Sequence, residues 1–190
     1  CADFEGNDLL AGWTGHTEEV GGALSLTPDA REGAGALRVT MPRHTAKGYA
    51  SLERAFVGPW RKVLLDFDAY LDPPSFAVND TSFGIKCIAY YRGSELQGVC
   101  TSIADGAAYF GTKTVAPFPT GRWVHVHDET DPVALTATSS IDGAAFGSDS
   151  FALPTATGST QIVVQIGVLG FNAPSPAASI RFDNVSVDLE

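Results

Sequence analysis

The stretch Ile180-Arg181-Phe182-Asp183-Asn184-Val185-Ser186-Val187 decides the fold of this chain. Ile180 and Phe182 share one side of an extended strand, whereas the two valines that follow share the other side. The apolar pattern therefore skips one residue at Asp183-Asn184, which is typical of a β-bulge in an antiparallel sheet. We expect a half-buried last strand in which the bulge turns Asp183 out of the regular ladder.

The chain begins with a similar run, Cys1-Ala2-Asp3-Phe4-Glu5-Gly6, in which a carboxylate again lies close to an aromatic residue. In an antiparallel β-sandwich the first and last strands can pair, and that pairing would bring Glu5 and Asp183 together. Two carboxylates with carbonyl oxygens from the turn at residues 29–35 suit a hard cation, so this interpretation predicts a structural Ca²⁺ ion. The alternative is that Asp183 caps a turn and Glu5 is solvated.

Short apolar or alternating runs, bounded by Gly, Pro, Asp and Ser, recur along the whole chain, and no stretch keeps helical periodicity. The expected strands include residues 23–26, 36–39, 63–71, 83–91, 123–127, 162–169 and 180–189. More than ten strands favour a two-sheet antiparallel β-sandwich over a small barrel. No repeat or change of composition divides the chain, so residues 1–190 are expected to form one domain.

Four short segments resemble a known group of domains. Trp123-Val124-His125-Val126, followed by Ser140-Ile141-Asp142-Gly143, is similar to the laminin-G and concanavalin-A-like pattern, in which a strand opening with Trp precedes a strand ending in an Asp-Gly turn. Residues 32–39 and 182–185 resemble the same group and jelly-roll carbohydrate-binding modules. The resemblance implies an all-β jelly roll, and such modules carry a structural calcium near the position of Asp183. One departure is Asp128, where these Trp strands continue with an apolar residue, so we expect the strand to end early or its end to be exposed.

Trp123, His125 and His127 alternate with Val124 and Val126, so the first three side chains share one face of a strand. If the valines are inside, an indole and two imidazoles line the opposite surface and form a platform on which a sugar could stack. The His-x-His pair could also bind zinc, although the sequence shows no third ligand. The alternative is a Trp packed in the core with two surface histidines.

Asp66 and Asp68 share one face of the strand at residues 63–71 and stand about 7 Å apart, a separation that glycosidases use. The concanavalin-A-like bacterial glucanases, however, use Glu, Asp and Glu at alternating positions, and this strand has Leu64 in the first place. Polysaccharide lyases of similar fold need a Tyr or His with Arg and Gln, an arrangement that the sequence does not reveal. We therefore name no catalytic residue, and the sequence favours a protein without enzymatic activity.

Cys87 and Cys100 flank a segment that is typical of a β-hairpin. With a two-residue turn at Gly93-Ser94, Tyr91 faces Leu96 and the two cysteines lie directly opposite each other in a non-hydrogen-bonded pair. That spacing suits a disulfide, which implies an oxidising compartment, whereas the alternative is two buried thiols. The interpretation predicts a protein that is secreted or displayed on a cell surface.

The first residue of the sequence is Cys1, which is what cleavage of a lipoprotein signal leaves at a mature N-terminus. A lipid on Cys1 would anchor the domain to the outer membrane, and membrane contact is expected only through that lipid. The alternative is a chain trimmed at this point by chance. The net charge of -10 argues against a nucleic-acid partner, since such binding depends on Lys and Arg.

These observations favour non-catalytic binding of a polysaccharide or glycoconjugate. Tyr90 and Trp123 belong to the aromatic residues from which a binding face could be drawn. The alternative is a structural or adhesive surface lipoprotein that binds another protein. A polysaccharide lyase or glycoside hydrolase is the weaker third interpretation.

Overall fold

The computed structural model describes the backbone of residues 2–43, 48–58, 62–73, 81–91, 94–97, 101–104, 107–110, 113–131, 134, 136–150, 160–171 and 177–190. Within these ranges it describes all side chains except those of residues 58, 81–91, 94–97, 101–104, 107–110, 113–117, 146, 149–150, 160–162 and 169–171. In this part of the chain no helix is long and apolar enough to cross a membrane.

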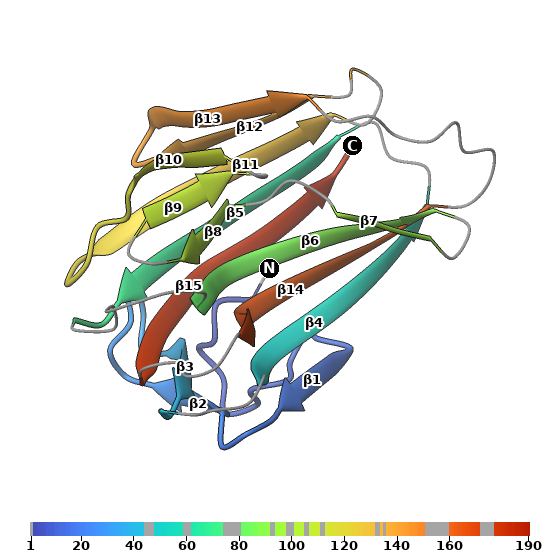
Figure 1. Cartoon of the computed structure of the whole chain (residues 1–190). Coiled ribbons are helices and arrows are strands. Elements are labelled where there is room, and N and C mark those ends of the chain that lie inside the picture. The colour runs from blue at the N-terminus through green and yellow to red at the C-terminus, as the bar shows by residue number, and fades with distance from the viewer. Residues whose placement is uncertain are drawn as a thin grey trace.

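The described strands form two antiparallel sheets, which Figure 1 shows as two layers. We name each sheet after a central strand. The β14 sheet has the order β1 (Gly15–Glu18), β4 (Tyr49–Gly58), β14 (Thr160–Phe171), β6 (Thr81–Tyr91), β8 (Thr101–Ala104), β9 (Ala107–Phe110) and β10 (Lys113–Pro117), with β7 (Ser94–Gln97) also paired to β6. The β5 sheet has the order β13 (Ala144–Ser150), β12 (Thr136–Ile141), β11 (Trp123–Asp131), β5 (Val63–Leu71), β15 (Ala178–Leu189), β3 (Ala36–Met41) and β2 (Ala23–Thr27). The expected two-sheet antiparallel sandwich is confirmed.

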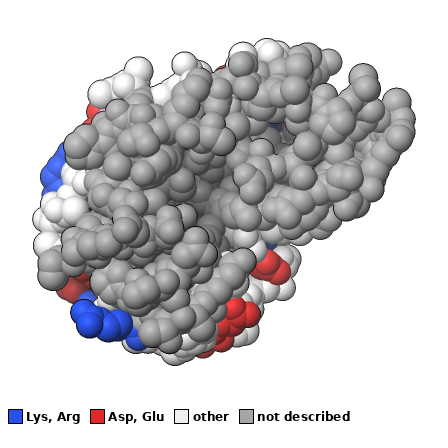
Figure 2. Space-filling model, viewed as in Figure 1, with Lys and Arg blue, Asp and Glu red and all other residues white. Residues whose placement is uncertain are grey.

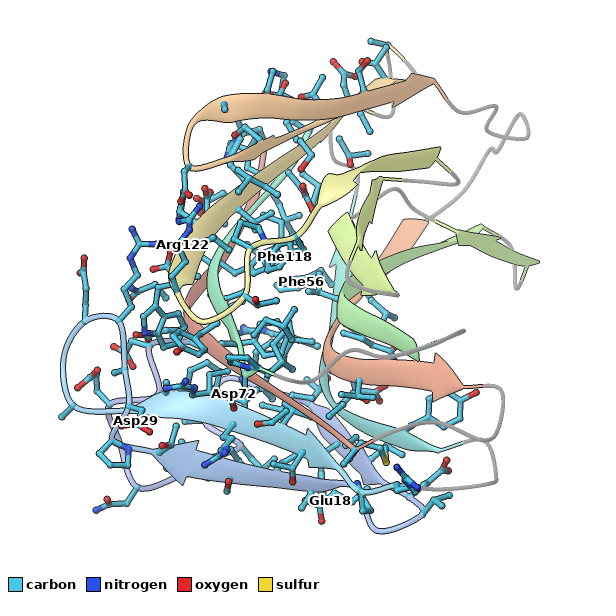
Figure 3. The ribbon with its side chains drawn as sticks, turned by 60° about the vertical axis from the view of Figure 1, so that its left-hand side comes forward. Glu18, Asp29, Phe56, Asp72, Phe118 and Arg122 are labelled. Atoms are coloured by element: carbon cyan, nitrogen blue, oxygen red, sulfur yellow. The ribbon has the colours of Figure 1, made fainter. Side chains whose placement is uncertain are left out.

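The core lies between the two sheets, because alternate residues of each strand point inward. Leu65, Phe67 and Leu71 of β5 are buried, and the ring of Phe67 lies 6.2 Å from the ring of Phe182 on β15. The β14 sheet contributes Leu52, Val164 and Ile166 among others. Figure 3 shows Phe56 and Phe118 directed into the space between the layers. The period-two apolar pattern of the sequence therefore marks the core correctly.

The bulge in the last strand is confirmed. Asp183 lies across from Asp68, but the next partner of β5 is Ser186 across from Asp66, so β15 has one extra residue between these pairs. Asn184 adopts a positive φ of 50°, which the short Asn side chain tolerates better than most. Because the bulge changes the parity, Phe182 and Val185 both point into the core.

The two ends of the chain also pair as expected. The N–H of Ala2 donates to the carbonyl of Val185 at 2.6 Å, and the N–H of Val185 donates back to the carbonyl of Ala2 at 2.9 Å. Phe4 is buried beside this bridge. Pairing between the first and last segments therefore closes the sheet at the bulge.

Two expectations about individual strands are wrong. The strand β11 continues to Asp131, and Asp128 is only 2% exposed. Asp128 lies across from Ser139 of β12, which is also buried, so a polar pair of positions replaces the apolar residue that the pattern led us to expect. A strand can bury a carboxylate where it has polar partners, and hydropathy along one strand does not reveal them.

The second error is the register of the predicted hairpin. Tyr91 of β6 lies across from Ser94 of β7, and Leu96 lies across from Ala89. The connection is therefore at residues 92–93, one residue earlier than expected, and each partner along β6 shifts by two positions. Cys100 lies outside the described residues, so the disulfide with Cys87 stays a prediction.

Gly167 in the middle of β14 supplies a test of the fold. A Cβ at this position would lie 2.2 Å from the carbonyl oxygen of Ala50, and the φ of 138° disfavours any other residue. We expect Gly167→Ala to lower the free energy of unfolding by about 2–4 kcal/mol, measured by urea denaturation. The control is Gly143→Ala, where φ is also positive but no atom lies within 4 Å. It should cost only about 1 kcal/mol; equal losses in the two variants would contradict the argument.

Candidate functional site

The predicted platform residues of β11 lie on the outer face of the β5 sheet. Val124 and Val126 are fully buried, so Trp123, His125 and His127 point away from the core. The side chains of both histidines are about two-fifths exposed, at 41% for His125 and 37% for His127. The valines of this strand are therefore inside, as the prediction of a surface platform at Trp123, His125 and His127 requires.

The structure joins these histidines to the two carboxylates that the sequence singled out. His125 lies across from Asp68 and His127 from Asp66, because β11 and β5 are neighbours. His127 Nδ1 is 2.7 Å from Asp66 Oδ1, and His125 Nδ1 is 2.9 Å from Asp68 Oδ1. Asp66 and Asp68, which share a strand face at a separation that glycosidases use, each bind an imidazole of β11.

The aromatic part of the same face is also engaged. The rings of Trp123 and Tyr70 meet edge to face at 5.6 Å, and the guanidinium of Arg181 lies 3.7 Å from the centre of the Tyr70 ring. Asp72 fixes Arg181 through a 2.6 Å ion pair, and Figure 3 shows where Asp72 lies on this side of the molecule. Because Arg181 covers a face of Tyr70, that face is not open for stacking by a sugar.

Asp183 lies at the centre of a buried polar group beside this face. Its Oδ2 accepts hydrogen bonds from the N–H groups of Arg31 and Glu32, at 2.9 and 3.2 Å, and its Oδ1 accepts one from Asn184 N–H at 2.8 Å. Neighbouring Asp68 accepts from the Arg31 guanidinium and from Asn184 Nδ2. Burial raises the pKa of Asp183 above its ordinary value of 3.8, and the negative charge of Asp68 adds to this, although the three backbone hydrogen bonds oppose it.

Glu5 reaches the same turn from the other end of the chain. Its Oε2 accepts a 2.6 Å hydrogen bond from Ala34 N–H, and its Oε1 lies 3.4 Å from Gly35 N. The turn at residues 29–35 thus connects Glu5 and Asp183, as the calcium interpretation expected, but it presents N–H donors to the carboxylates. Among the described residues no group of three or more His, Cys, Asp or Glu side chains is placed to hold a metal.

The remaining predicted site residues do not join this face. Tyr90 belongs to β6 of the β14 sheet, so it lies in the other layer from Trp123, His125 and His127. Its side chain is not among those described. Cys1 lies outside the described residues, so a lipid at this position stays a prediction.

The outer face of the β14 sheet carries a polar pair that sequence reasoning missed. Glu53 of β4 lies across from Gln165 of β14, and Gln165 Nε2 donates to Glu53 Oε2 at 3.1 Å. On its other side Gln165 lies across from Lys86 of β6. The available signal was Gln165 itself, a polar residue inside the apolar run from Ile162 to Leu169.

Small residues flank this pair on the neighbouring positions of β1, β4 and β14. Ser51 and Gly167, the next positions along β4 and β14, are buried although they point away from the core. Gly15 of β1 leaves the space that the Glu53 side chain fills, because a Cβ there would lie 2.6 Å from Glu53 Oε1. Small residues therefore surround a half-buried carboxylate and amide.

No family model and no curated protein matches this chain. Solved structures do match. The endo-β-1,4-glucuronan lyase from the fungus Trichoderma reesei has a TM-score of 0.72 at 16% identity, covering 97% of this chain and 94% of that one. Alginate lyase vAL-1 from Chlorella virus has a TM-score of 0.64 at 7% identity, with 95% and 94% covered. The cellulose-induced protein Cip1 has a TM-score of 0.61 at 13% identity, with 88% and 85% covered.

At these identities the likeness establishes the fold. The chain is a concanavalin-A-like jelly-roll β-sandwich, and its structure resembles those of polysaccharide lyases. The expectation of a concanavalin-A-like domain is confirmed. What a domain of this fold does must be argued from its own side chains.

The buried carboxyl of Asp183 leads to a pH-dependent prediction. Because its pKa is raised, the folded protein holds this proton more tightly than the unfolded chain. The contribution of Asp183 to stability is therefore largest below about pH 4 and decreases as the pH rises through the folded pKa. Asp183→Asn has no such proton, so the free energy of unfolding of the wild type minus that of the variant should fall as the pH rises above about 4. Urea denaturation at a series of pH values measures this, and a difference that stays flat or rises contradicts it. The exposed Asp188→Asn is the control.

Calcium at Glu5 and Asp183 stays a prediction. An ion that binds only the folded state raises the melting temperature by mass action, so Tm should be higher in calcium than in chelator. Glu5→Gln keeps the size of this exposed side chain but removes its charge, and it should abolish the response. A Tm that is the same in calcium and in chelator would contradict the prediction of a calcium ion at this turn.

Proposed function

We propose that this protein binds a polysaccharide or glycoconjugate, without cleaving it, on the outer face of the β14 sheet. The observation that carries the proposal is the hydrogen-bonded pair of Glu53 and Gln165 near the middle of that face. The described contact uses one carboxylate oxygen and one amide N–H, so the pair retains oxygens that accept from sugar hydroxyls and an N–H that donates to them. Carbohydrate sites combine a few such polar groups with a concave surface.

The β5 sheet supports the proposal less well, although it holds most of the residues that the sequence suggested. Each imidazole there is held by a carboxylate, and Arg181 is held between Tyr70 and Asp72. A sugar would have to replace these contacts before it could bind. The outer face of the β14 sheet requires no such exchange among its described residues.

The likeness to solved structures supports a carbohydrate ligand. The matched structures include lyases of glucuronan and alginate, and the chain covers most of their length. The resemblance to polysaccharide lyases implies that cleavage would need a His or Tyr together with Arg and Gln. The residues across from Gln165 are Glu53 and Lys86. The next positions on the same face of β4 and β14 are Ser51, Ala55, Val163 and Gly167. None of these six positions is His, Tyr or Arg, which favours binding over cleavage at Gln165, although Tyr90 lies on the same face, across from Gln161.

Two single variants test the location. Affinity electrophoresis through gels that contain a soluble polysaccharide should show retardation of the wild type. Gln165→Ala and Glu53→Ala should each weaken binding about threefold to tenfold, because each loses one or two hydrogen bonds to the ligand. Thr138→Ala, an exposed position on β12, is the matched control and should bind like the wild type.

His127→Ala separates the two faces, since it lies on the outer face of the β5 sheet. If His127→Ala loses polysaccharide binding while Gln165→Ala binds like the wild type, the ligand binds at Trp123, His125 and His127 of β11 and the proposed location is wrong. Release of unsaturated uronates or reducing ends by the wild type would contradict the non-catalytic part of the proposal. If the protein binds no polysaccharide, the carbohydrate-binding proposal is wrong, and the alternative is a surface that binds another protein.

A further inference from the structure

The charges on the proposed binding face indicate what kind of polysaccharide it accepts. Strand pairing places one row of residues across β1, β4, β14 and β6: Gly15, Glu53, Gln165 and Lys86. Directly opposite residues in antiparallel strands share a face, so these four positions lie on the outer face of the sheet. The neighbouring rows contain Thr17, Ser51, Gly167 and Gly84 on one side and Ala55, Val163 and Ile88 on the other.

These rows hold one acidic and one basic residue, at positions that flank Gln165. Neighbouring strands are about 4.8 Å apart, so the positions of Glu53 and Lys86 are separated by about 10 Å. The row therefore holds one acidic and one basic position, with no net formal charge. The other cation on the four strands, Arg54, belongs to the side between the sheets, where its guanidinium lies 5.2 Å from the Phe56 ring.

Such a face would attract a polyuronate only weakly, because it holds few cationic positions. A polyuronate presents one carboxylate on each sugar, and proteins bind carboxylates through Arg and Lys, most effectively in bidentate pairs with Arg. The net charge of -10 repels a polyanion from a distance. Figure 2 shows acidic side chains at the lower right of the molecule, in the view of Figure 1.

A neutral polysaccharide fits the same positions. Hydroxyl groups of a sugar both donate and accept hydrogen bonds, which matches the amide of Gln165, the carboxylate of Glu53 and the hydroxyl of Thr17. We infer that the ligand is a neutral polysaccharide and not a polyuronate, in contrast to the glucuronan and alginate lyases whose fold this chain shares. The inference rests on the proposed function and narrows it to one class of ligand.

Affinity electrophoresis of the intact chain against two groups of polymers tests the inference. The neutral group is mixed-linkage β-glucan, xylan and galactomannan, and the anionic group is alginate and polyglucuronate. We expect retardation by at least one neutral polymer and by neither polyuronate. Affinity for the neutral polymer should change by less than about twofold between 0.05 and 0.5 M NaCl, because a contact without net charge is hardly screened.

The outcomes separate the inference from the proposal beneath it. Binding to a polyuronate that weakens steeply with salt overturns the inference but keeps carbohydrate binding. Binding to none of the five polymers overturns both. Gln165→Ala should lose affinity for the neutral polymer about threefold to tenfold, while Thr138→Ala with the same Tm as the wild type should keep it. Equal affinity of the wild type and Gln165→Ala would show that the neutral ligand binds elsewhere and would overturn the inference for this face.

Discussion

The structure depends on one buried carboxylate, that of Asp183. This side chain is fully buried, and it accepts three backbone N–H groups, two of which come from a turn about 150 residues earlier in the chain. Without this acceptor, buried donors would lack partners, at a cost of about 1–3 kcal/mol each. The same bulge shifts the parity of β15, so that Phe182 and Val185 both face the core and the first segment can pair at Val185. The bulge at Asp183 therefore accounts both for the pairing of the two ends of the chain and for the burial of the last strand.

The two outer faces differ in how their polar groups are used. On the β5 sheet, imidazoles, carboxylates and guanidinium groups bind each other across neighbouring strands, so this face is cross-linked by its own side chains. On the β14 sheet, the described polar pair of Glu53 and Gln165 stands among small residues and retains hydrogen-bonding capacity. This asymmetry is why we place the ligand on the β14 sheet.

Much of the fold follows from patterns within single segments. The strand at residues 63–71 has its expected bounds, and the Asp-Gly turn at 142–143 has the two positive φ values, 50° and 77°, that a two-residue hairpin turn requires. The errors arose where a partner outside the segment decides the outcome. Asp128 is buried with the polar Ser139 across from it on β12, and the β6–β7 register shifts because the connection is one residue earlier than expected. The candidate site was missed for the same reason, since Glu53 and Gln165 are 112 residues apart.

The sequence by itself determined the all-β class, the inward side of most strands and the bulge at Asp183, because period-two burial is a local property that each strand displays alone. Only the tertiary structure decided which polar groups meet. In the folded chain Asp66 and Asp68 lie across from the histidines of β11, and Tyr90 lies in the other layer. Glu53 lies across from Gln165. The physical reason is that contacts between strands depend on sheet order and register. Both are set by the packing of the whole sandwich and cannot be read from any one strand.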